Sequence, residues 1–262
     1  GLRDRIESRY LNGSGNSPVR AVEAAVGDDV ITTGIGSDVA IGGLGNETID
    51  VSDGANIVIG DEGKIHYQNQ LSDLEEISTH FTDGAGSFAQ GGEHTITSGT
   101  GRDYILSGSG SDRLTSGDGA DVILRDGQIL FHPGTSIPSM IQTAYQDDND
   151  VLLSSGDSVI FSGGGDDIVF AGSGNDWVEG GTGGDLLVGD EGIVTFDPGH
   201  AAAGEAVVDF IESVFLTPDG QLIPGGSDVL LGQHDDDIVI GGSLDDMLDG
   251  GFGRDILVGN HV

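Results

Sequence analysis

The chain has 262 residues, with 48 glycines, no cysteine, 5% aromatic residues and a formal net charge of −36 at pH 7. This charge opposes compaction and argues against nucleic-acid phosphates as ligands, while the lack of cysteine excludes disulfides and thiolate metal sites. The sequence fits either a disordered acidic segment or a fold that needs a cation. Periodic aliphatic residues favour the second, because disordered acidic chains lack them.

No apolar run approaches the ~18 residues of a membrane span. The first ten residues, GLRDRIESRY, contain no apolar core of a signal peptide. We therefore expect an internal piece of a longer protein that does not insert into a membrane.

Residues 1–26 hold no repeat and are predicted to be a partial insert. From residue 27 the chain follows a nine-residue plan, which is clearest in residues 163–189. There Asp167, Asp176 and Asp185 lie nine apart, each two residues after a glycine and two before an aliphatic residue. We read one repeat array over residues 1–262, in which blocks of four turns (27–60, 92–125, 156–189 and 225–262) alternate with inserts (61–91, 126–155 and 190–224).

The inserts repeat as well. Each begins with a turn and an alternating apolar pair, a period of two that indicates a half-buried strand: Ile65/Tyr67, Ile129/Phe131 and Val194/Phe196. A second element has isoleucine four residues before an aromatic residue: Ile77/Phe81, Ile141/Tyr145 and Ile211/Phe215, with Ile6/Tyr10 repeating it in the partial insert. A helix also fits, because Leu71, Leu74, Ile77 and Phe81 have its spacing and Ser72 with Glu75 mimics a capping box. We favour strands, and hence hairpins.

The nonapeptide G-G-x-G-x-D-x-U-x resembles that of the RTX (repeats-in-toxin, haemolysin-type) calcium-binding family. The inserts, with VGDEG followed by IESVF-like segments, look like those of very large secreted RTX adhesins. The resemblance implies an all-β fold, a right-handed parallel β-roll in which two units make one coil. It also implies Ca²⁺ ions between turns two units apart, each held by two carboxylates and by backbone carbonyls.

The predicted metal ligands alternate between the two edges of such a roll. The even turns present Asp38, Asn56, Asp103, Asp121, Asp167, Asp185, Asp237 and Asp255. The odd turns present Asp29, Glu47, Asp112, Asp176, Asp228 and Asp246, together with His94 and Ser158, which lack a carboxylate and put their sites in doubt. We therefore expect the even row to be the better occupied.

Stacked carboxylates about 4.8 Å apart repel one another by roughly 3 kcal/mol each at an effective dielectric of about 20. Summed along a row, this repulsion exceeds the ~5–15 kcal/mol stability of a typical domain. The roll is therefore not expected to stay folded without calcium.

The strands also differ by parity. The even strands, such as Val39–Ile41 and Leu186–Val188, are apolar on both faces, as in a sheet buried on both sides, whereas the odd strands often carry polar outward residues. The hairpins are the predicted cover of the even sheet. Solvent exposure of Ile41, Leu106, Val188 and Ile240 would contradict this hypothesis.

We expect a non-catalytic, monomeric spacer of a large secreted bacterial protein of adhesin type. It would be extracellular or cell-surface, order on binding external Ca²⁺, and have neighbouring repeats of the same chain as partners. Gly156-Asp157-Ser158 resembles an esterase motif, but Ser158 occupies the ligand slot of a turn; the histidines lack zinc-binding spacing. The alternatives are an accessory module of a secreted hydrolase or epimerase, or a ligand- or ice-binding module.

Overall fold

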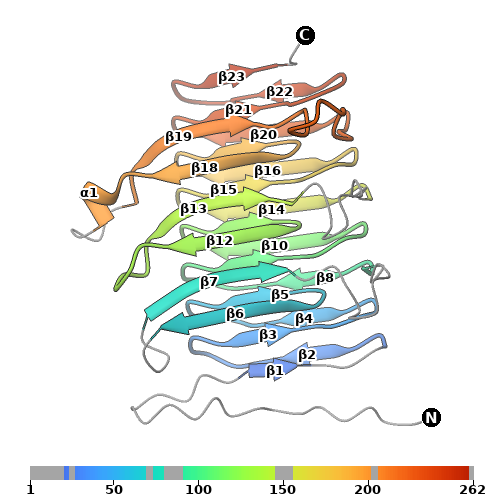
Figure 1. The fold of residues 1–262 in the computed structure, drawn as a ribbon, viewed down its shortest axis with the longest axis vertical. Coiled ribbons are helices and arrows are strands. Elements are labelled where there is room, and N and C mark those ends of the chain that lie inside the picture. Colours follow the sequence, from blue (N-terminus) through green and yellow to red (C-terminus); the bar gives the residue numbers. More distant parts are fainter. Residues whose placement is uncertain are drawn as a thin grey trace.

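A computed structural model describes residues 21–23, 27–68, 73–79, 91–144, 156–201 and 206–259. Two parallel sheets wind together as a β-roll, and a third, antiparallel sheet lies beside it (Figure 1). The only helix in these residues is α1 (Pro198–Ala201). No helix in the described part is long and apolar enough to cross a membrane.

Sheet A contains the strands that follow the even turns, and each predicted apolar triplet is one strand. One further strand, β1, precedes them in a segment where the sequence pattern predicted none. The nine strands pair in parallel in this order: β1 (Ala21–Glu23), β3 (Val39–Ile41), β5 (Ile57–Ile59), β9 (Tyr104–Leu106), β11 (Val122–Leu124), β15 (Ile168–Phe170), β17 (Leu186–Val188), β21 (Ile238–Ile240) and β23 (Ile256–Val258).

Sheet B contains the strands that follow the odd turns. Four of them, β10, β14, β16 and β20, run six residues rather than the predicted three, because pairing continues through Gly117, Gly163, Gly181 and Gln233. The order is β2 (Val30–Thr32), β4 (Thr48–Asp50), β8 (Thr95–Thr97), β10 (Arg113–Asp118), β14 (Val159–Gly164), β16 (Trp177–Thr182), β20 (Val229–His234) and β22 (Met247–Asp249).

The roll continues across every insert. Strand β5 pairs with β9, β11 with β15, and β17 with β21, although an insert separates the members of each pair in sequence. The sequence left open whether four short rolls form instead. The structure has one continuous roll.

Sheet C is built from the three inserts. Each insert is a hairpin, as favoured from the sequence, and neighbouring hairpins pair antiparallel through β7–β12 and β13–β18. The strands are β6 (Gly63–Gln68), β7 (Asp73–Thr79), β12 (Gly127–Phe131), β13 (Pro138–Thr143), β18 (Gly192–Phe196) and β19 (Val208–Ser213). Of the predicted insert positions, Ile6, Tyr10, Leu71, Ser72, Phe81 and Tyr145 lie outside the described residues.

The apolar positions of the hairpins form one row across sheet C. The register aligns Ile65 with Ile77, Ile129 with Ile141, and Val194 with Ile211. A hydroxyl joins each hairpin to the next. The Gly127 N–H donates to Thr79 Oγ1 (3.1 Å), and the Gly192 N–H donates to Thr143 Oγ1 (2.9 Å).

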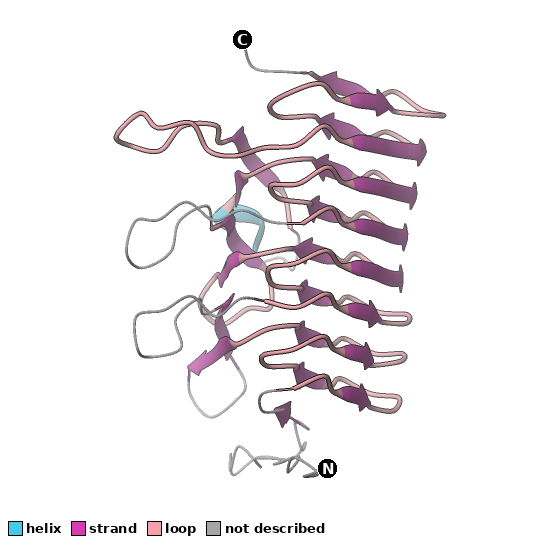
Figure 2. Ribbon diagram, turned by 90° about the vertical axis from the view of Figure 1, so that its right-hand side faces the viewer, coloured by secondary structure: helices cyan, strands magenta, loops and turns pink. Residues whose placement is uncertain are grey.

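Sheet A lies between sheets B and C (Figure 2). One apolar layer fills the inside of the roll between sheets A and B, and another lies between sheets A and C. The outer face of sheet A packs against the hairpin row: Leu106 and Val188 are fully buried, Ile240 is 7% exposed and Ile41 is half-buried. The predicted cover of the even sheet is therefore confirmed. Strand β23, at the C-terminal end of sheet A, is exposed instead.

Candidate calcium-binding turns

Many of the turns have a positive φ at two positions, four and two residues before the predicted ligand. Before Asp185 these are Gly181 (φ 114°) and Gly183 (φ 115°), a region that residues with a Cβ rarely adopt. The turn before Asp237 uses Gln233 (φ 78°) and Asp235 (φ 75°) instead. The turn geometry is thus maintained even where glycine is replaced.

From Asn56 onward, each predicted ligand ties its turn to the preceding coil through one side-chain atom. In the even row the Asp121 N–H donates to Asp167 Oδ1 (2.8 Å), the Asp167 N–H to Asp185 Oδ1 (3.0 Å), and the Asp185 N–H to Asp237 Oδ1 (2.8 Å). In the odd row, the Asp176 N–H donates to Asp228 Oδ1 at 2.8 Å. This use of Oδ1 leaves the other carboxylate oxygen for a different partner.

The second oxygen, Oδ2, is buried and has no hydrogen-bond partner among the described residues. Burying a carboxylate without compensation is costly, so a repeated orphan oxygen indicates that a cation belongs there. In the even row these atoms belong to Asp38, Asp103, Asp121, Asp167, Asp185 and Asp237, and in the odd row to Asp29, Asp112, Asp176, Asp228 and Asp246.

A second set of oxygens is revealed by the one amide in the series. Asn56 keeps the Oδ1 role, because its Oδ1 accepts the Asp38 N–H (3.0 Å). Its Nδ2 takes the place of Oδ2 and donates to the carbonyls of Ser52 (3.2 Å) and Gly54 (3.0 Å), four and two residues before it. Those two carbonyls therefore face the same place as the orphan oxygens.

The donor set fits Ca²⁺. This ion takes six to eight oxygen ligands and accepts carboxylates and backbone carbonyls in a flexible cage. A glycine five residues before several of the ligands leaves room for their Oδ2 atoms. A Cβ on Gly180 would lie 2.3 Å from Asp185 Oδ2, and one on Gly232 would lie 2.2 Å from Asp237 Oδ2. Any side chain there would displace the unpartnered oxygen.

The pKa values show the electrostatic strain of the rows. Burial, followed by the charge of neighbouring carboxylates, raises the pKa of Asp185 and of Asp228 to about 8. Burial likewise raises the pKa of Asp176 to about 8 and that of Asp167 to about 7, although both accept backbone hydrogen bonds. These shifts indicate that the ionised rows are unfavourable unless a cation neutralises them.

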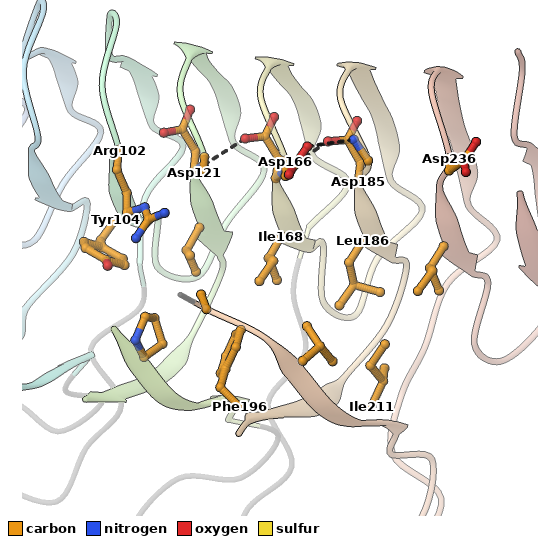
Figure 3. Close-up of a pocket in the computed structure, with 18 residues that line it drawn as sticks. Arg102, Tyr104, Asp121, Asp166, Ile168, Asp185, Leu186, Phe196, Ile211 and Asp236 are labelled. Carbon is orange, nitrogen blue, oxygen red and sulfur yellow. Dashed lines mark hydrogen bonds between the residues drawn. The ribbon is translucent and has the colours of Figure 1, made fainter. Parts of the chain in front are cut away.

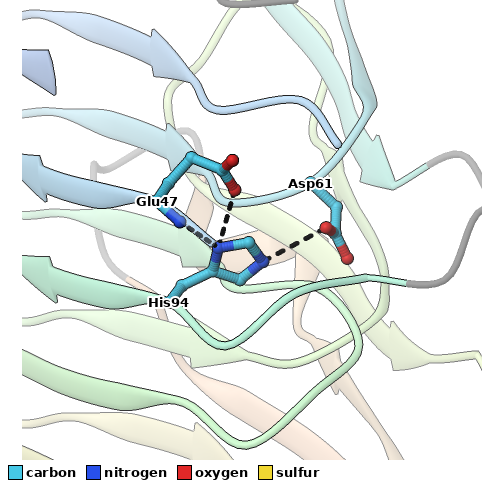
Figure 4. Close-up of side chains that lie close together, drawn as sticks. All are labelled: Glu47, Asp61 and His94. Atoms are coloured by element: carbon cyan, nitrogen blue, oxygen red, sulfur yellow. Dashed lines mark hydrogen bonds and ion pairs between the residues drawn. The ribbon is translucent and has the colours of Figure 1, made fainter. Parts of the chain in front are cut away.

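Of the two turns without a carboxylate, that of Ser158 keeps the turn-to-turn bond, and that of His94 has an ion pair in its place. Ser158 Oγ accepts the Asp112 N–H (3.2 Å). His94 lies fully buried between two carboxylates, with Nδ1 2.8 Å from Glu47 Oε2 and Nε2 3.1 Å from Asp61 Oδ1 (Figure 4).

Those distances favour a protonated ring. The Glu47 N–H also lies 3.2 Å from Nδ1, but the shorter contact with a carboxylate oxygen requires Nδ1 to donate. Burial would lower the pKa of His94, but hydrogen bonds to Asp61 and Glu47 outweigh it and raise the pKa to about 10. Glu47, Asp61 and His94 lie close enough to hold a metal ion, yet in this arrangement the imidazolium already offsets one of the two carboxylate charges.

Sequence reasoning missed the acidic residues that begin the inserts. Asp190 clamps two odd turns: its Oδ1 accepts the Gly226 N–H (2.8 Å) and its Oδ2 accepts the Ser243 N–H (2.6 Å). Asp61 Oδ2 similarly accepts the Ser109 N–H at 2.8 Å. The GDEG shared by the first and third inserts is the available signal, but on its own it indicates only a turn.

A cavity of about 500 Å³ opens between the even turns and sheet C (Figure 3). Its apolar wall includes Ile168, Leu186 and Phe196, and its opposite side carries Asp166 and Asp236. The turn-to-turn bonds of the even row run along this side. The cavity therefore adjoins the even row of predicted ligands, since Asp121, Asp167 and Asp185 also line it.

The family model described as RTX calcium-binding nonapeptide repeat (4 copies) matches residues 23–58, 41–64, 91–123, 144–178 and 225–248, which together cover about half of the chain. No curated protein and no solved structure gave a significant match. The family match is to a repeat that binds Ca²⁺ and not to a catalytic family. Together with the parallel roll and its rows of buried carboxylates, it shows that the chain belongs to the RTX calcium-binding repeat family.

Proposed function

We propose that this chain is a structural spacer of a large secreted, adhesin-type protein, and that it becomes a rigid rod when Ca²⁺ binds outside the cell. The single observation that carries the proposal is the repeated Asp geometry. Oδ1 links adjacent coils, while Oδ2 is buried and unpartnered. Without a cation the rows oppose folding, and with one they join successive coils.

The ions would lie along both edges, held by Oδ2 of the predicted aspartates and by carbonyls four and two residues before them. The even row would be fuller, because Asp103, Asp121, Asp167, Asp185 and Asp237 follow one another with an orphan Oδ2 in each. In the odd row His94 and Ser158 interrupt the series. Asn56 is the weakest of the proposed ligands, since its Nδ2 already faces the carbonyls.

Neighbouring repeats of the same chain are the proposed partners. Strand β19 presents Val208 (41% exposed) and Phe210 (50% exposed) at the edge of sheet C. Ser213 Oγ is buried and has no partner among the described residues, whereas the equivalent Thr79 and Thr143 each accept a glycine N–H from the next hairpin. A further hairpin would complete both features.

The test is a calcium titration followed by far-ultraviolet circular dichroism, with reversal by EDTA. Strand content should rise with Ca²⁺, fall when EDTA is added, and respond far less to Mg²⁺, which demands a tighter octahedral site. Full strand content in EDTA, unchanged by calcium, would contradict the proposal.

A further inference from the structure

Arg125 is the only charged residue at the three insert junctions, the positions where a strand of sheet A leads into an insert. It follows β11 directly and is 3% exposed. At the same position after β5 and β17 the chain has Gly60 and Gly189. A buried guanidinium at this one junction therefore needs a specific explanation.

The guanidinium is bound by backbone carbonyls of the odd turns. Nε donates to Gly108 O (3.3 Å) and Nη2 donates to Gly110 O (2.5 Å). Nη1 donates to Gly156 O (3.0 Å) and Ser173 O (2.9 Å). These carbonyls come from the turns of Asp112, Ser158 and Asp176, so one side chain joins three successive coils.

The carbonyls are of the kind that a calcium ion would use. Gly108 and Gly110 lie four and two residues before Asp112, the positions whose carbonyls receive Asn56 Nδ2 in the even row. Gly156 lies two residues before Ser158. The guanidinium thus occupies a carbonyl cage, and its positive charge stabilises the ionised forms of Asp112 and Asp176.

Arg125 and Ser158 depart from the repeat together. At the third insert the corresponding pair is Gly189 and Asp228, and there a Cβ on Gly189 would lie 2.2 Å from Asp228 Oδ2. A side chain at this junction therefore conflicts with a carboxylate in the next odd turn. The short Ser158 removes that carboxylate oxygen and still accepts the Asp112 N–H.

We propose that the guanidinium of Arg125 is a built-in cation that takes the place of one calcium ion in the odd row, between the turns of Asp112 and Asp176. Arginine stays protonated and offers five donors in a rigid fork, so unlike Ca²⁺ it cannot dissociate or be chelated. The coils on either side of the second insert are then held together at low calcium and provide a centre from which the rest of the roll orders. This inference rests on the proposed function, because it assumes that other turns of the odd row bind Ca²⁺.

The first test converts the second junction into a copy of the third. The double variant Arg125→Gly/Ser158→Asp should bind one more Ca²⁺ per chain than the wild type, measured by equilibrium dialysis and atomic emission on protein shown to be folded by circular dichroism. An unchanged ion count in the folded double variant would overturn the inference. A wild type that binds no Ca²⁺ would instead contradict the proposed function.

The second test uses the unmodified chain. At calcium concentrations that only partly saturate the protein, hydrogen exchange should be slower for the Asp112 amide, which crosses the Arg125 junction, than for the Asp176 amide, which crosses the third junction to Asp228. Equal or faster exchange at Asp112 would overturn the inference, whether or not the double variant folds.

Discussion

Replacing Asp185 by asparagine should change the stability of the roll in opposite directions with and without calcium. Asp185 is 2% exposed in the even row, and burial together with the charges of Asp167 and Asp237 raises its pKa from 3.8 to about 8. Each pKa unit corresponds to about 1.4 kcal/mol, so at pH 8 the ionised side chain costs the calcium-free roll on the order of 5 kcal/mol.

An amide at this position would avoid that cost. Asn56 shows that asparagine keeps the Oδ1 bond to the preceding coil and uses Nδ2 to bind the carbonyls four and two residues earlier, here Gly181 and Gly183. Without calcium, Asp185→Asn should therefore fold more readily than the wild type. With calcium it should bind at least one ion fewer and unfold at a lower denaturant concentration, because an ionic ligand has been lost.

The assay is folding in EDTA at pH 8, induced by trimethylamine N-oxide and followed by circular dichroism, alongside denaturant unfolding in excess Ca²⁺. Asp209→Asn is the matched control, because it removes the same charge from an exposed position on β19. The control should shift neither transition appreciably. Shifts of the same sign for Asp185→Asn in EDTA and in calcium would refute the reasoning.

Three further outcomes are expected. The calcium-free roll should lose stability as pH rises from about 4 to about 8. Burial raises the pKa of Asp167 to about 7 and that of Asp176 to about 8. The cost of ionising these carboxyl groups in the folded roll is therefore absent below their pKa in the unfolded chain and complete above their pKa in the folded chain. Folding in EDTA that is independent of pH would contradict this. Ile141→Ala should lower the unfolding free energy of the calcium-bound protein by about 2–5 kcal/mol, because Ile141 is fully buried under sheet A. The half-buried Ile193→Ala should cost much less, and equal losses would refute the covering role of sheet C. Asp190→Ala should cost about 1–3 kcal/mol for each donor it orphans at Gly226 and Ser243. The insert control Asp197→Ala should have little effect on unfolding in calcium, and a loss matching that of Asp190→Ala would contradict the clamp.

The sequence was sufficient for the roll because its repeat specifies both turn and strand. Asp185 and Leu186–Val188 lie where the nonapeptide predicts, since turn and strand alternate with a fixed period. The apolar outer residue Val188 also indicated that sheet A needs a cover, and the hairpins provide it.

Other features depend on contacts between segments far apart in sequence. That β7 pairs with β12, so that the hairpins form one sheet, follows from the stacking of coils and from no local pattern. The clamp of Asp190 and the carbonyl cage around Arg125 likewise arise only when the junction of one insert meets the turns of neighbouring coils. A single buried arginine among glycine-rich turns gives no periodic signal, so its role could not be read from spacing.

Calcium binding along the rows is tested most directly by a crystal structure of the calcium-loaded chain with anomalous scattering from Ca²⁺. Anomalous peaks should lie beside the Oδ2 atoms of Asp103, Asp121, Asp167, Asp185 and Asp237, and none in the carbonyl cage around Arg125. A folded, calcium-saturated roll whose ions lie away from these oxygens would contradict this prediction.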